Sequence, residues 1–90
     1  MTAFRSGRIV GTHGAIEAMR LAGVSSATLL ERHLNGDWGD LDEDDKRANN
    51  WSLHNRARLL SSYRIAEGVT VWIITEADRS STTFLLPSEY

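Results

Sequence analysis

A chain of 90 residues is long enough for one domain, residues 1–90, and has no room for a second. Its 41% apolar and 24% charged content is that of an ordinary globular protein, and the absence of cysteine excludes disulfides, thiolate catalysis and cysteine-ligated metal centres. The net charge of −2, with the arginines spread along the chain, disfavours direct nucleic-acid binding, which usually needs a clustered basic surface.

Targeting and cofactor motifs are missing from the sequence. No apolar run approaches the roughly 20 residues of a membrane span, and the first residues, MTAFRSGRIV, lack the apolar core of a signal peptide. There is no P-loop, no GxGxxG and no GxSxG motif. We therefore expect a cytoplasmic protein that does not contact a membrane and needs no cofactor.

The first third of the chain is predicted to be helical. Residues 7–10 can form a short opening strand, and a helix follows that begins at Thr12 or His13 and ends at Gly23. A second helix, over residues 25–36, has a serine at its start and leucines at helical spacing. Both helices are short and need a packing surface to persist in water.

The segment GDWGDLDEDDK, which follows, contains six of the twelve acidic residues. Asp42 stands at an expected helix N-cap, and Glu43, Asp44 and Asp45 occupy the first helical turn, where the helix dipole favours carboxylates. A third helix is therefore predicted from here to about Asn55, with Trp51 on its buried side. This helix start does not explain why Asp37, Trp38 and Asp40 precede it.

The second half of the chain changes to the period-two pattern of strands. ARLLSSYRIAEG and VTVWIITE predict two strands joined at Gly68, and STTFLLP predicts a third strand that ends at Pro87. The fold class is therefore α+β, with two to three short N-terminal helices packed on a C-terminal three-stranded antiparallel meander. The third strand is expected at an edge of the sheet, where a second copy could pair with it to give a homodimer.

Neither a metal site nor a histidine-based site is supported by the spacing of residues. An EF-hand loop that begins at Asp40 would have Asp45 at the glycine position and Trp51 at the bidentate glutamate position, so the motif fails. The three histidines lack the spacing of paired metal ligands. His33, beside the leucines of the second helix, is expected to be a hydrogen-bonded core or boundary residue.

The order of helices before a meander also permits a ribonuclease. Metal-independent ribonucleases of the barnase/RelE type have this element order and need a base, an acid and a cation near the phosphate. In this alternative interpretation, the catalytic residues are His54, Arg58, Arg64, Glu76, Arg79 and Thr83. A structural role for Arg79, as a turn residue that pairs with Glu76 or Asp78, is favoured over this catalytic role.

Several blocks of the sequence resemble a group of short bacterial proteins that are carried on plasmids and other mobile elements. The most specific blocks are GDWGDL and ITEADRSSTTFLLPSEY, and the similarity extends over nearly the whole chain. A departure is His13, where the group is expected to have proline. The resemblance implies a genomic context but no mechanism.

From these observations we expect a small non-enzymatic protein-binding accessory module of a mobile element. Its partner would be a host or element-encoded protein complex. The most specific function we expect is inhibition of a nucleic-acid-handling complex such as a restriction or CRISPR system. An acidic surface can occupy a cationic site that normally holds phosphates. The expected contact residues are Asp37, Trp38, Asp40, Asp42, Glu43 and Asp44, with Trp38 either an exposed anchor or a residue that holds the loop to the body.

Overall fold

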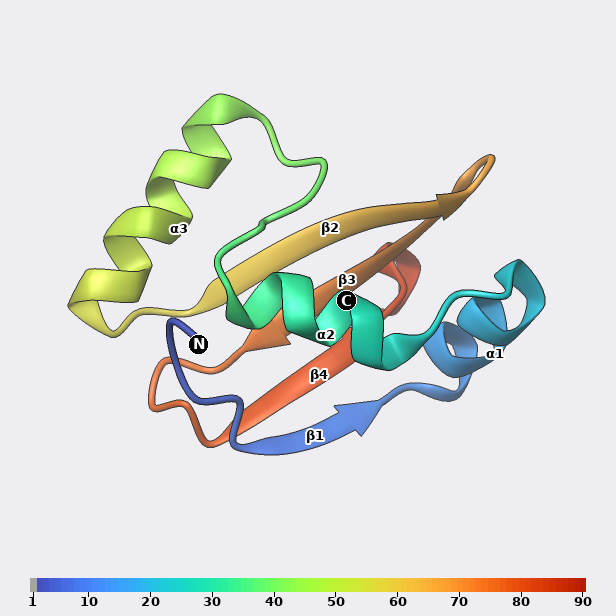
Figure 1. Ribbon diagram of the computed structural model, residues 1–90, viewed down its shortest axis with the longest axis horizontal. Helices are drawn as coiled ribbons and strands as arrows, with labels where there is room; N and C mark the ends of the chain where they lie inside the picture. Colours follow the sequence, from blue (N-terminus) through green and yellow to red (C-terminus); the bar gives the residue numbers. More distant parts are fainter. Residues whose placement is uncertain (1) are drawn as a thin grey trace.

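The first strand of the chain lies beside the last one, so the sheet is mixed (Figure 1). The computed structural model describes residues 2–90, and its strand order is β1-β4-β3-β2. β1 (Arg8–Gly11) runs parallel to β4 (Ser81–Leu85), whereas β4 and β2 (Leu59–Ala66) are each antiparallel to β3 (Val69–Thr75). The α+β class is confirmed, but the expected meander is only part of a four-stranded sheet.

The expectation that the third strand of the meander lies at an edge is wrong. β4 has β3 on one side and β1 on the other, so the edges of the sheet are β1 and β2. The short N-terminal strand could be predicted, but its parallel pairing partner lies more than 70 residues away in the chain and has no local sequence pattern. An edge-to-edge homodimer would therefore have to use β1 or β2.

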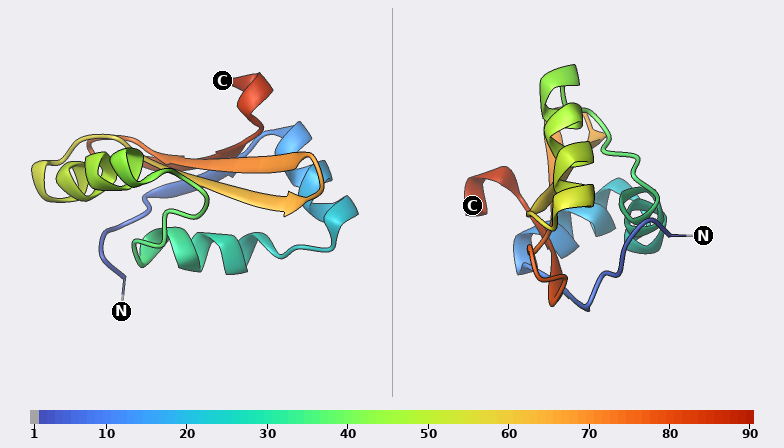
Figure 2. Two further views of the ribbon diagram at one scale, coloured as in Figure 1. Left: turned by 90° about the horizontal axis from the view of Figure 1, so that it is seen from above. Right: turned by 90° about the vertical axis from the view of Figure 1, so that its left-hand side faces the viewer.

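The helices occupy two different positions around the sheet (Figure 2). α1 (His13–Ala22) and α2 (Ser26–Leu34) contribute residues to a core that they share with one face of the sheet. α3 (Glu43–Asn55) lies beside the outer edge of β2. The short 3-10 helix η1 (Pro87–Glu89) lies on the opposite side of the sheet from α2.

The helix ends follow the local chemistry of the sequence. The Thr12 hydroxyl accepts a hydrogen bond from the Ala15 N–H at 3.1 Å, and Asp42 accepts one from the Asp45 N–H at 2.8 Å, so both are N-caps. Gly23 ends α1 in the left-handed region with φ of 68°. These starts and stops are confirmed. None of the helices within residues 2–90 is long and apolar enough to cross a bilayer.

The hydrophobic core lies between the sheet and the first two helices. Its members alternate along the strands and recur at helical spacing on α1: Ala15, Met19, Leu29, Tyr63, Val71, Ile73 and Phe84. Trp51, expected in the core, is 62% exposed, so that expectation is wrong. The reason is the position of α3 at the sheet edge, where its only buried residue is the polar Asn49.

Candidate functional site

The GDWGD loop covers the outer edge of β2. The Ser62 N–H donates to the Trp38 carbonyl at 3.1 Å, and the Asp40 N–H donates to the Ser62 carbonyl at 2.7 Å. The Asp40 carboxylate then accepts the Arg64 N–H at 2.7 Å. Gly39 has φ of 77°, and a Cβ there would lie 2.1 Å from the Ser62 carbonyl oxygen, so only glycine permits this approach.

Asn49 on α3 completes the cover of the same edge. Its side-chain amide donates to the carbonyl of Leu60, and its side-chain oxygen accepts the Leu60 N–H at 3.1 Å. One asparagine thus replaces both hydrogen bonds that a further strand would make with Leu60. Together the loop and Asn49 satisfy backbone groups that would otherwise be open to another strand.

Trp38 holds the loop to the body of the protein. Its side chain is 3% exposed, and its indole Nε1–H donates to the Asn50 side-chain oxygen at 3.0 Å. Its ring stacks on Phe4 at 6.2 Å and meets His33 edge-on at 5.8 Å. Trp38 therefore holds the loop to the body of the protein, and its buried indole cannot be an exposed anchor in this conformation.

The expected contact carboxylates fall into two groups. Asp37 pairs with Arg32 at 2.7 Å, and this hydrogen bond lowers the pKa of the Asp37 carboxyl. Asp40 and Asp42 accept hydrogen bonds from backbone N–H groups, so all three carboxylates have structural roles. Only Glu43 and Asp44 remain highly exposed, at 81% and 85% of their side chains, in pairs with Lys46 and Arg47.

The residues of the ribonuclease interpretation are only partly brought together. Arg58 and Glu76 form an ion pair at 3.6 Å, and Thr83 lies on the neighbouring strand opposite Ile74. Arg64 lies on β2, six residues after Arg58, which directly precedes the strand, and six residues of extended chain span about 20 Å.

The other two members of that set are bound to the backbone. The Arg79 guanidinium donates to the carbonyls of Ala57, Glu76 and Ser52, in place of the expected carboxylate pairing. His54 donates to the Asn50 carbonyl of its own helix at 2.9 Å. The acid, base and cation that ribonuclease chemistry needs therefore do not converge on one point.

A chain of hydrogen bonds runs through the core at His33. The Ser6 carbonyl can only accept, so Thr82 donates to it at 2.7 Å, Thr75 donates to Thr82 at 2.7 Å, and His33 Nε2–H donates to Thr75 at 2.8 Å. Nδ1 then accepts from the Ser61 hydroxyl at 2.5 Å. His33 is fully buried, and burial lowers its pKa to about 4, so it is the expected hydrogen-bonded core histidine.

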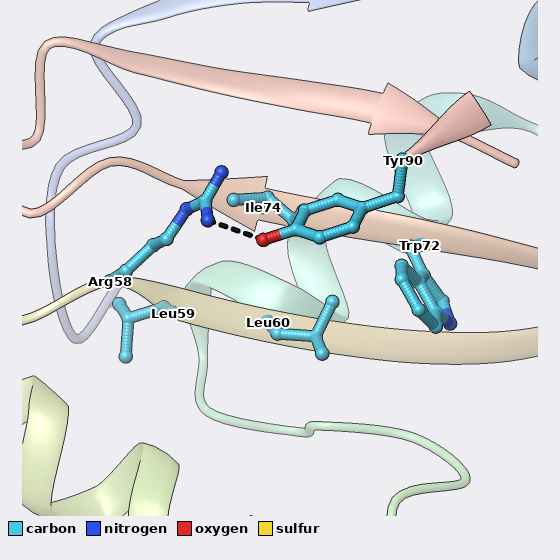
Figure 3. Close-up of a pocket in the computed structure, with 6 residues that line it drawn as sticks. All are labelled: Arg58, Leu59, Leu60, Trp72, Ile74 and Tyr90. Carbon is cyan, nitrogen blue, oxygen red and sulfur yellow. Dashed lines mark hydrogen bonds between the residues drawn. The ribbon is translucent and has the colours of Figure 1, made fainter. Parts of the chain in front are cut away.

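The face of the sheet opposite α2 contains an apolar cleft (Figure 3). The cleft has a volume of about 260 Å³ and is lined by Arg58, Leu59, Leu60, Trp72, Ile74 and Tyr90. The Tyr90 ring meets Trp72 edge-on at 5.8 Å, and its hydroxyl accepts a hydrogen bond from Arg58 at 2.7 Å. Tyr90 is 69% exposed, so the rim of the cleft is accessible.

This cleft was not identified from the sequence, although β3 contains a signal for it. A half-exposed antiparallel strand usually alternates apolar and polar residues. In β3, Val71 and Ile73 point to one face while Trp72 and Ile74 point to the other, so both faces are apolar. Such a strand indicates cover on both faces. The core shared with α1 and α2 supplies it on one face, whereas on the other η1 and Tyr90 cover only part of the surface, including Ile74, which is 5% exposed.

No metal centre or related protein adds to this picture. Among residues 2–90, no three histidine, aspartate or glutamate side chains gather in the arrangement of a metal site. Comparisons with protein-family models, with curated proteins and with solved structures gave no match. The candidate functional site is therefore assigned from geometry. It is the apolar cleft on the sheet face opposite α2, called the open sheet face below.

Proposed function

We propose that the protein is a non-enzymatic protein-binding accessory module that holds an anchor side chain of its partner in the cleft on the open sheet face. The observation that supports this most is the convergence of Trp72, Tyr90 and Arg58 around one apolar cleft. Tryptophan, tyrosine and arginine are the residue types that dominate binding energy at protein interfaces.

The size of the cleft favours a protein partner over a small molecule. Its volume of about 260 Å³ is below the 300–1,000 Å³ that is typical of ligand pockets. A single large apolar side chain from a partner suits such a space, between the Tyr90 ring and Leu60. Arg58, which is 48% exposed in its side chain, can add a polar contact at the rim.

The partner is proposed to be a host or element-encoded protein complex, on the basis of the resemblance to proteins of mobile elements. The narrower form, an inhibitor of a nucleic-acid-handling complex, is favoured by the exposed Glu43 and Asp44 at the start of α3. These carboxylates can approach a cationic surface without loss of a structural contact in the core. Asp37, Trp38 and Asp40 no longer belong to the proposed contact surface, because they hold the loop on β2.

The test is an affinity capture of the tagged protein from a nuclease-treated bacterial lysate, followed by measurement of affinity for the captured protein. Tyr90→Ala should weaken that affinity by about tenfold or more, as expected when an interface hot spot is truncated. Trp51→Ala is the matched control, since it removes an aromatic residue of similar exposure from α3. Both variants should keep the thermal transition of the wild type.

The outcomes separate the two surfaces. Loss of binding in Tyr90→Ala, with binding kept in Trp51→Ala, supports the cleft. If the charge-reversed variant Glu43→Lys/Asp44→Lys loses the partner while Tyr90→Ala retains it, the acidic turn is the contact surface and the cleft is not. Capture of RNA alone from an untreated lysate, with no protein captured after nuclease treatment, would favour the ribonuclease interpretation instead.

A further inference from the structure

A second cavity lies at the end of the sheet where three distant segments meet. The N-terminal segment, the end of α3 and the turn between β3 and β4 lie together there (Figures 1 and 2). The cavity has a volume of about 470 Å³ and is lined by Phe4, Arg5, Leu53, Arg56, Asp78 and Arg79. Three of its six residues are thus arginines.

The walls of this cavity are fixed to one another by backbone contacts. Gly7 has φ of 63°, and a Cβ there would lie 2.4 Å from the Arg79 carbonyl oxygen, so the N-terminal segment lies directly against the turn. The Arg79 guanidinium donates to the Ala57 carbonyl at 2.6 Å and to the Ser52 carbonyl at 3.2 Å. These bonds tie the same turn to the end of α3, so the Arg79 guanidinium is held in one place.

The cavity has more positive than negative charge. Within residues 2–90, Arg5 and Arg56 make no ion pair, and both are exposed. The one carboxylate, that of Asp78, already accepts the Ser80 N–H at 3.0 Å. Burial, and then the charge of Arg56, lower the pKa of Arg79.

Backbone conformation singles out the same residues. Among residues 2–90, the only non-glycine residues with positive φ are Arg56, at 52°, and Arg79, at 61°. This left-handed conformation costs a non-glycine residue about 1–2 kcal/mol, and glycine is the usual choice at a helix end such as that of α3. Both positions instead have an arginine, and both side chains line the cavity.

We propose that this cavity binds the phosphate group of a small phosphate ester. Guanidinium groups present forked donors that match phosphate oxygens, and Arg5 and Arg56 can supply them, while Arg79, whose guanidinium is largely bonded to backbone carbonyls, adds its positive charge beside them. The volume lies within the range of small-molecule sites, so there is room for a nucleoside or sugar attached to the phosphate. This site is separate from the apolar cleft and does not depend on it.

The test is a titration of the ¹⁵N-labelled protein with adenosine monophosphate at low ionic strength, followed by NMR. The side-chain Nε–H signals of Arg5, Arg56 and Arg79 should shift. Inorganic phosphate should shift the same signals, and adenosine, which lacks the phosphate, should not. Arg56→Gly should weaken the affinity for adenosine monophosphate by about tenfold, as expected for the loss of a charge-assisted hydrogen bond.

Arg56→Gly tests the side chain alone, because glycine adopts φ of 52° without strain. The substitution therefore removes the guanidinium without weakening the fold. Arg20→Gln is the matched control, because Arg20 lies on α1, does not line the cavity and pairs with Glu17. It should change the affinity less than about twofold. Equal affinity for adenosine and adenosine monophosphate, or unchanged affinity in Arg56→Gly, would overturn the proposal.

Discussion

His33 makes the stability of this protein depend on pH. Its ring is fully buried, and both ring nitrogens are used by hydroxyls, with Ser61 as donor to Nδ1 and Thr75 as acceptor from Nε2. A proton on Nδ1 would reverse the Ser61 bond, since the hydroxyl would have to accept, and would place a charge in the core near the charge of Arg79. The folded state therefore requires neutral His33.

The magnitude follows from the two pKa values. Burial lowers the pKa of folded His33 from 6.5 to about 4. The unfolded state therefore binds a proton that the folded state does not bind between these pH values. Stability is complete above pH 6.5 and falls as the pH drops toward 4, by a total of about 3 kcal/mol at about 1.4 kcal/mol per unit. A domain of this size has about 5–15 kcal/mol in all, so the loss is large.

The assay is urea unfolding of the wild type and of His33→Gln at several pH values between 7 and 4.5. The variant should be less stable at pH 7, because its amide cannot restore both bonds, but its stability should change little over this range. Asp37, with its lowered pKa, adds a loss only as the pH falls below about 4. A wild-type stability that is flat from pH 7 to 4.5, or one that falls equally in His33→Gln, would refute the reasoning.

Three further predictions concern the edge of β2 and the end of α3. Asn49→Ala leaves the Leu60 N–H and carbonyl without partners, and should cost about 1–3 kcal/mol in urea unfolding and increase self-association in light scattering. Gly39→Ala places a Cβ 2.1 Å from the Ser62 carbonyl oxygen, and should cost about 3 kcal/mol or more; a loss below about 1 kcal/mol would contradict the close approach. Arg56→Gly should raise the free energy of unfolding by about 1 kcal/mol, and any loss of stability would show that the Arg56 side chain has a structural role.

Local signals in the sequence predicted the elements well. Asp42 as N-cap and Gly23 as helix stop depend on groups within four residues of each other, and both are found. The period-two pattern over residues 59–66 and 69–75 likewise predicted strands, and β2 and β3 are found there. What is local in the chain could be predicted because capping, propensity and side-chain periodicity act over a few residues.

Contacts between distant segments could not be predicted in the same way. The Asp40 carboxylate accepts a backbone N–H from a residue 24 positions away, and the Trp38 indole donates to Asn50. These are polar contacts, which hydrophobic patterning does not detect. Trp51 shows the converse error, because an apolar residue on a helix predicts burial only when that side of the helix meets the core. α3 instead meets β2 through Asn49, so its tryptophan faces solvent.

The places where local rules and structure disagree are the better guide to function. The GDWGD loop, chemically the most unusual segment, is explained by its backbone and side-chain bonds to β2, and this leaves little of it free for a partner. Trp72 and Ile74 break the polar alternation of a half-covered strand, and Arg56 and Arg79 occupy conformations where glycine is favoured. Such violations persist when something other than folding requires them, and they cluster at binding sites. The apolar cleft and the arginine-lined cavity each contain two of these residues, and this is why both sites are assigned there and not to the acidic segment.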